Sequence, residues 1–318
     1  MDVTQKGQEG RVIEIDMLKG FAALCVAVGH LALMYDASNI LYRWIFQFHM
    51  PAFFLTAGFC ASTKSLNQRP LRFFWKKFKQ LMIPDYFFRL FMCLSYCFRI
   101  GTIKDLRFVL STIPSYLWHY SVEWFMPTML MCYVGVYLFA QCRKRMGVIS
   151  WGYALLLCAF TPFVCSKLKA YGIGDVNLFV NLSTVPLCFS FMLLGNFFRE
   201  VAVPWVRGQL VQYDSPQKKR KACLYVWILA LLCVVLMAVY IARNNYAYVN
   251  LATVFLGDSE LLLYFCATAI SLLLIGFFHY IYIYIYIYIG KARSRTGLCN
   301  ILHFADSIPW ESICFISS

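Results

Sequence analysis

The sequence has little charge for its length. Of its 318 residues, 14% are charged and 61% are hydrophobic, whereas a typical soluble domain is about a quarter charged and about half apolar. So few polar side chains cannot cover a globular protein in water, which excludes an ordinary soluble enzyme. Long apolar runs recur instead, and each is close to the ~20 residues that a membrane-spanning helix needs.

These runs predict an all-α, polytopic membrane helical bundle with about eight transmembrane helices. The predicted spans cover residues 17–35, 44–62, 79–98, 121–141, 149–166, 181–198, 223–242 and 261–280. The longest internal connection, 200–222, separates six spans from two, and no connection is large enough to fold as a soluble domain. An inverted-repeat transporter would show an internal repeat, and none is visible.

Acidic residues are scarce: 15 Asp and Glu stand against 29 Lys and Arg, for a net charge of +14. With the N-terminus inside, 20 of the basic residues fall in cytoplasmic segments and 7 on the opposite side, while Lys19 and Arg89 lie within spans. The positive-inside rule therefore predicts a cytoplasmic N-terminus. The basic charge is explained by topology and by attraction to anionic lipid, so no nucleic-acid partner is predicted.

Metal-ligand spacing and a cleavable leader are also missing. The 14 cysteines are scattered, mostly inside spans, without a CxxC pair. We therefore expect small apolar packing residues, and neither a disulfide framework nor a metal site. The first ten residues are polar and no small-residue cleavage site follows the first apolar run, which predicts a retained span.

Tyrosine and isoleucine alternate strictly over ten residues near the C-terminus. Residues 280–289 read YIYIYIYIYI, which alternating TAT and ATA codons would encode. One interpretation is a repeat tract in the gene, which makes 1–280 the membrane domain and 281–318 the tract and an aberrant, out-of-frame tail. The other is a continuous helix end. The last span would then run 29 residues, about 43 Å, and exceed a ~30 Å hydrocarbon core.

Ionisable residues interrupt the first span, in DMLKGFAALCVAVGH. On a helix they share a stripe about 80° wide with two small residues, a set made up of Asp16, Lys19, Ala23, Ala27 and His30. Polar groups in membranes face the bundle interior or a wet cavity, so this face is predicted to point inward. Two alternatives stay open: Asp16 and Lys19 neutralise each other at a helix end, and His30 is a hydrogen-bonded packing residue.

Two further spans carry ionisable residues near their predicted outer ends. In FQFHMPAFFLTAGF, Pro51 loosens the turn that holds His49. The first span ends on the side of the membrane where the second begins. His30, late in the first span, and His49, early in the second, are therefore expected to meet at similar depth. In HYSVEWFMPTML, Glu123 is a carboxylate able to orient an imidazole. The alternatives are that His49 is an interfacial histidine and that Glu123 is a solvated acid at a helix N-terminus.

Four stretches together resemble the acyltransferase family 3 membrane proteins, whose bacterial members O-acetylate sugars and surface polysaccharides. They are RVIEIDMLKGFAALCVAVGH, FHMPAFFLTAGF, KKFKQLMIP and EWFMPTML. They occur in the family's order and spacing over about residues 11 to 130, and the remainder matches only as further spans. The spacing from Lys19 to His30 resembles the family's basic residue, ten-residue gap and histidine.

The resemblance implies an O-acetyltransferase of the bacterial inner membrane. It would move an acyl group, most simply acetyl, from acyl-CoA to a hydroxyl of a sugar or cell-surface polysaccharide, with acyl-CoA as co-substrate and no bound cofactor. His30 would be the catalytic histidine, acting as general base. The remaining candidates are His49 and Glu123 for catalysis, and Arg11, Asp16, Lys19 and Arg89 for the acyl donor.

Two departures from the family leave other functions open. The family often carries arginines four apart in its third span, whereas here Asp85 stands four residues before Arg89 and the two are expected to pair. It also usually has about ten spans, so an eight-span chain suggests truncation. The alternatives are a small-solute transporter or exporter, whose path would be lined by the charged face, and an inactive, truncated acyltransferase.

Overall fold

The computed structural model describes residues 13–35, 40–61, 63–101, 104–118, 124–170, 184–205 and 264–278, with the single positions 228, 231, 232, 234, 235, 239 and 281. Every regular element within these ranges is a helix. The chain divides into two compact units. The first contains residues 1–56, 197–248 and 265–318, and the second contains 57–196 and 249–264.

In the first unit, α1 (Ile13–Tyr35) packs against α2 (Ile40–Phe59). The approach is close because position 29 is glycine: a Cβ there would lie 2.9 Å from the Ile45 side chain and 3.1 Å from the Phe46 ring. The Phe21 and Phe48 rings stack across the same two helices, with centroids 6.2 Å apart. The unit also contains the π-helical segment η1 (Phe198–Ala202) and most of a helix at 264–278.

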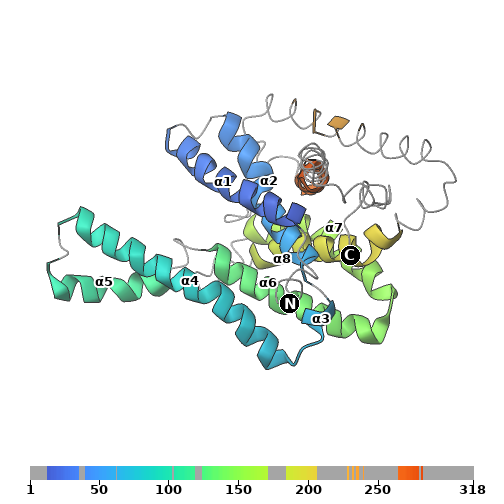
Figure 1. The fold of residues 1–318 in the computed structure, drawn as a ribbon, viewed down its shortest axis with the longest axis horizontal. Helices are drawn as coiled ribbons and strands as arrows, with labels where there is room; N and C mark the ends of the chain where they lie inside the picture. The colour runs from blue at the N-terminus through green and yellow to red at the C-terminus, as the bar shows by residue number, and fades with distance from the viewer. Residues whose placement is uncertain are drawn as a thin grey trace, which may run out of the picture. The chain divides into compact units, whose positions relative to one another are not determined.

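The second unit contains the remaining helices: α3 (Thr63–Leu66), α4 (Pro70–Arg99), α5 (Leu106–Trp118), α6 (Phe125–Met146), α7 (Ile149–Ala170) and α8 (Thr184–Phe197). α5 runs back along the C-terminal end of α4 (Figure 1). Cys93, Cys97 and Val109 are buried between these two helices. The Asp105 carboxylate accepts hydrogen bonds from two backbone N–H groups in the first turn of α5, which caps that helix.

Described helices occur at the predicted spans, except at 223–242, where only single positions are described. Four are long and apolar enough to cross a membrane: Ile15–Tyr35, Pro70–Arg99, Phe125–Met146 and Thr184–Trp205. The chain is therefore a multi-pass integral membrane protein. Residues 106–118 lie between two predicted spans, and the helix that they form, α5, was not predicted. Its 13 residues are too few to span, and its apolar side is covered by α4.

Most cysteines in the described part of the chain are buried, in keeping with the packing role predicted for them. All ten are free thiols, and the buried ones are Cys25, Cys93, Cys97, Cys132, Cys158, Cys165 and Cys188. Two act as weak donors between helices. Cys132 Sγ donates to the Val185 carbonyl at 3.7 Å, and Cys158 Sγ donates to the Ser190 carbonyl at 3.4 Å.

The C-terminal end of α2 crosses α8 without space for a side chain. A Cβ at Gly58 would lie 1.8 Å from the Met192 carbonyl oxygen, well inside van der Waals contact. One turn further along the chain, Asn196 Nδ2 donates to the carbonyls of Gly58 and Ala61 at 3.5 and 3.2 Å. These carbonyls end a helix inside the protein, where unpaired backbone groups are costly, so Asn196 acts as their cap.

We predict that Gly58→Ala destabilises the protein by about 1–3 kcal/mol, because the added methyl group meets backbone rather than a movable side chain. The thermal midpoint of the purified protein, followed by the loss of helical circular dichroism, should fall by several degrees. Gly152→Ala in α7 is the matched control. A Cβ at that position would have no neighbouring atom within 4 Å, and alanine favours the helix by roughly 0.5–1 kcal/mol. Equal midpoints for the two variants would contradict the close crossing.

Candidate active site

His49 is buried in α2 and its orientation is fixed by the backbone. Its side chain is 2% exposed, and Nδ1 lies 2.7 Å from the Ile45 carbonyl oxygen one turn earlier. Because a carbonyl oxygen only accepts, Nδ1 carries the proton in this contact. In the neutral ring Nε2 then keeps its lone pair, which makes this nitrogen available as a hydrogen-bond acceptor or base.

His30 lies near the C-terminal end of α1, and one phenylalanine ring, Phe46, contacts both His30 and His49. The Phe46 ring touches both imidazoles edge-on: its centroid is 5.9 Å from that of His30 and 4.8 Å from that of His49. The planes cross at 77° and 68°. The two histidines, expected to meet at similar depth, therefore both contact one aromatic side chain. His30 is exposed and His49 is buried.

The face of α1 that carries His30 is not the packed one, which corrects the sequence interpretation. The buried residues of this helix are Ile15, Leu18, Ala22, Cys25, Gly29 and Ala32. They follow the i, i+3, i+4 spacing of a helix face that packs against a neighbour. On the predicted inward face, Asp16 and Lys19 are half-buried and His30 is exposed. Small residues occur on both faces, so their presence did not identify the packed one.

Asp16, Lys19 and His30 nevertheless remain on one continuous stripe of α1. Eleven residues separate Lys19 from His30, which corresponds to about 16 Å along the axis at ~1.5 Å per residue. Asp16 and Lys19 lie in the first turns of the helix, and His30 lies near its other end. An extended substrate lying along α1 would thus meet a cation at one end and an imidazole at the other.

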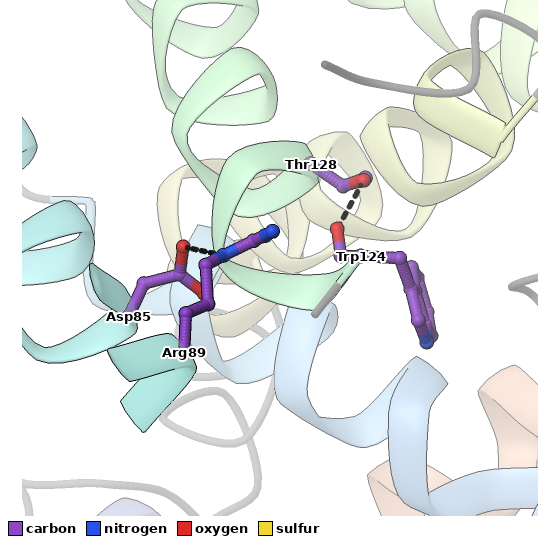
Figure 2. A network of polar contacts seen from close by, with 4 residues as sticks. All are labelled: Asp85, Arg89, Trp124 and Thr128. Atoms are coloured by element: carbon purple, nitrogen blue, oxygen red, sulfur yellow. Dashed lines mark hydrogen bonds and ion pairs between the residues drawn. The ribbon is translucent and has the colours of Figure 1, made fainter. Parts of the chain in front are cut away.

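Asp85 and Arg89 form a buried ion pair on α4. Arg89 Nε donates to Asp85 Oδ2 at 2.8 Å, and Asp85 is 2% exposed and Arg89 1%. The pairing expected from their four-residue spacing is therefore confirmed. The guanidinium points toward the first turn of α6, where the Thr128 hydroxyl donates to the Trp124 carbonyl at 2.8 Å (Figure 2). A charge of either sign alone at this depth would be costly, and the pair offsets much of that cost.

Sequence reasoning missed two polar residues of α2. The predicted second span began at residue 44 and left Arg43 just outside it, but α2 begins at Ile40 and buries Arg43, with Gln47 one turn further on. Their side chains are 7% and 0% exposed. The i, i+4 spacing was the available signal. A charged residue at a predicted span edge is usually solvated, so the pattern favoured a loop.

Two candidate residues, Arg11 and Glu123, and nearly all of the Tyr-Ile tract and following tail lie outside the described residues. Their predicted roles are therefore carried forward as proposals. Within the described ranges, no group of three or more His, Cys, Asp or Glu side chains is arranged to hold a metal ion.

Comparison with known proteins places this membrane helical protein in a family. Residues 12–292 match the family model for the acyltransferase domain of the third acyltransferase family. A curated relative, the nodulation protein NolL of Sinorhizobium fredii, is 27% identical over 281 residues, which covers 83% of this chain and 67% of the relative. No solved structure matches the chain.

The membrane helices and the family match together define a multi-pass membrane enzyme. The chain belongs to acyltransferase family 3 and is an O-acyltransferase. The resemblance found in four stretches of sequence is confirmed, and the family match extends well beyond them. Because membership is established by the match over most of the chain, a transporter is no longer the competing class.

We predict that Asp85→Ala lowers the stability of the protein by about 3–5 kcal/mol, because it leaves the Arg89 guanidinium buried without its carboxylate. The measurement is the thermal midpoint in detergent. The double variant Asp85→Ala/Arg89→Met, which removes both charges, should recover most of the loss. A double variant no more stable than Asp85→Ala would show that uncompensated charge is not the cause.

Proposed function

We propose that this enzyme transfers an acetyl group from acetyl-CoA to a hydroxyl of a sugar or cell-surface polysaccharide, with His30 as the general base. The observation that carries the proposal is the stripe of α1, on which an accessible imidazole stands about three turns from the half-buried Lys19. Family membership supports acyl transfer as the reaction. The donor, the acceptor and the role of His30 are our inference.

In the proposed reaction, His30 takes the proton of the acceptor hydroxyl as its oxygen attacks the thioester carbonyl. A C–O bond forms and a tetrahedral intermediate carries the negative charge on the former carbonyl oxygen. The intermediate collapses with cleavage of the C–S bond. The CoA thiolate leaves and takes the proton from the His30 imidazolium, which restores neutral imidazole. Direct transfer requires no serine or cysteine nucleophile.

His49 is proposed as the second catalytic histidine. Its Nδ1–H is held by the Ile45 carbonyl, so the free Nε2 can accept a hydrogen bond from the acceptor sugar. The Phe46 ring contacts both imidazoles. Glu123 is proposed, on the family resemblance, to orient an imidazole. A carboxylate in that position would stabilise the imidazolium formed during proton transfer.

The acyl donor is proposed to lie along α1 with its phosphates near Lys19 and its thioester near His30. Lys19 supplies a charge-assisted hydrogen bond to phosphate, Asp16 holds the lysine, and Arg11 adds a second cation just before the helix. Arg89 is assigned to donor binding by resemblance alone, and its Nε is engaged by Asp85. We infer a cytoplasmic N-terminus in a bacterial inner membrane, which brings Lys19 to the side that contains acyl-CoA.

We predict that His30→Ala reduces acyl transfer by about 10²–10⁴-fold, because the acceptor hydroxyl loses its general base. The measurement is incorporation of label from radiolabelled acetyl-CoA into a membrane glycan extract by membranes containing the protein. Leu31→Ala is the matched control, since Leu31 is the next residue on α1 and is 57% exposed. Transfer that survives in His30→Ala would remove His30 from catalysis and direct attention to His49.

A further prediction concerns the donor end of the stripe. Lys19→Ala should raise the KM for acetyl-CoA by roughly 10–100-fold with kcat nearly unchanged, because a charge-assisted hydrogen bond contributes about 1.5–3 kcal/mol to binding. Lys19→Arg should restore most of the affinity, since arginine also binds phosphate. Steady-state kinetics at saturating acceptor separate the two constants. A fall in kcat alone would place Lys19 at the reacting atoms instead.

A further inference from the structure

α4 is longer than the hydrocarbon core of a membrane. Its 30 residues rise about 45 Å at ~1.5 Å per residue, against ~30 Å for the core. With Arg99 at one interface, the last twenty residues fill the core and contain the Asp85–Arg89 pair. The first ten, from Pro70 to Lys79, then lie at and beyond the other interface, in the headgroup region.

Four basic side chains line one face of this outer part. Arg69, Arg72, Lys76 and Lys79 fall within an arc of about 80° at ~100° per residue. All four lie at the accessible surface of the helix. We call them the basic stripe. The sequence contains no Asp or Glu between Asp36 and Asp85. The stripe is therefore a local excess of positive charge spread over about 15 Å of helix.

Exposed apolar side chains stand next to the basic stripe. Leu71, Phe74 and Trp75 are 84%, 42% and 56% exposed. The Trp75 ring stacks on Phe78 with centroids 5.6 Å apart and planes within 4°, and Lys79 Nζ lies 5.8 Å from the Trp75 centroid. Aromatic rings beside cations are typical of the membrane–water interface, where one side of the residue is apolar and the other is wet.

The third face of the same segment is fixed to α6. The Phe73 and Tyr137 rings stack 4.9 Å apart, and Lys77 Nζ lies 3.8 Å from the Tyr133 centroid. The Tyr137 hydroxyl also donates to the Gln68 carbonyl at 3.0 Å, just before α4 begins. Packing therefore orients the segment and directs the basic and apolar stripes away from α6.

We propose that the first ten residues of α4, with Arg69, form a docking surface for anionic phospholipids in the leaflet where α4 begins. The basic stripe binds the headgroup phosphates, and the adjacent Phe74 and Trp75, which lie nearer the core than Leu71, contact the glycerol region and the upper acyl chains of the same lipids. A soluble phosphate compound would use the cations but leave the apolar side chains in water, so the combination favours lipid. This interaction is separate from acyl transfer and does not rest on His30.

The test measures binding of phosphatidylglycerol and phosphatidylcholine to the full chain by native mass spectrometry. Arg72→Gln/Lys76→Gln/Lys79→Gln should weaken phosphatidylglycerol binding at least tenfold, since each cation near an anionic surface contributes about fivefold, and should leave phosphatidylcholine binding unchanged. The matched control is Arg99→Gln/Lys104→Gln/Arg107→Gln. It removes the same charge from exposed residues near the opposite end of α4 and leaves the basic stripe intact, so it should lose clearly less phosphatidylglycerol affinity than the stripe variant.

Three results would overturn the proposal. Equal losses in the two triple variants would show an effect of net charge alone, and unchanged phosphatidylglycerol binding in the first would exclude the surface. Binding of free CoA that the first variant abolishes, with phosphatidylglycerol binding intact, would assign the stripe to a soluble phosphate. The thermal midpoint in phosphatidylcholine alone checks folding, and a stripe variant that loses stability there is replaced by Lys76→Gln/Lys79→Gln.

Discussion

The absence of water in the hydrocarbon core is the constraint on which this structure depends. Each polar group there must find its partner within the protein. Asp85 and Arg89 meet this requirement within one turn of α4, and Asn196 meets it by donating to one carbonyl at the C-terminal end of α2 and one just beyond it. The His49 ring binds the carbonyl one turn before it. Because these partners are local or backbone groups, the polar residues are held in fixed orientations that a catalytic site can use.

The positions of the spans could be predicted from the sequence because hydropathy averages over about twenty residues and tolerates isolated polar ones. The proximity of His30 to His49 followed from the opposite directions of two consecutive spans. The Asp85–Arg89 pair followed from helical spacing alone. Family membership was visible in four short stretches, because they contain residues that a membrane span does not need. Lys19 and His30, within an apolar run, are examples.

Other features depended on contacts that spacing does not encode. α5 is short and amphipathic, so its helix is recognisable only once α4 is present to cover its apolar side. The packed face of α1 could not be chosen because Ala23 and Ala27 on one face are as small as Ala22 and Gly29 on the other. Burial of Arg43 depends on where α2 begins, and helix boundaries are the least certain part of any sequence interpretation.

The buried thiols can report when the helices that contain them separate. Cys132, Cys158 and Cys188 are inaccessible in the folded helices, whereas Cys60 and Cys142 are exposed. A maleimide dye would therefore label Cys60 and Cys142 at once, and would label these three buried thiols only when α6, α7 and α8 separate. Slow labelling at these three positions, assigned by peptide mass, measures that separation without any engineered probe. The same chemistry makes the unfolded chain prone to oxidative cross-linking during purification.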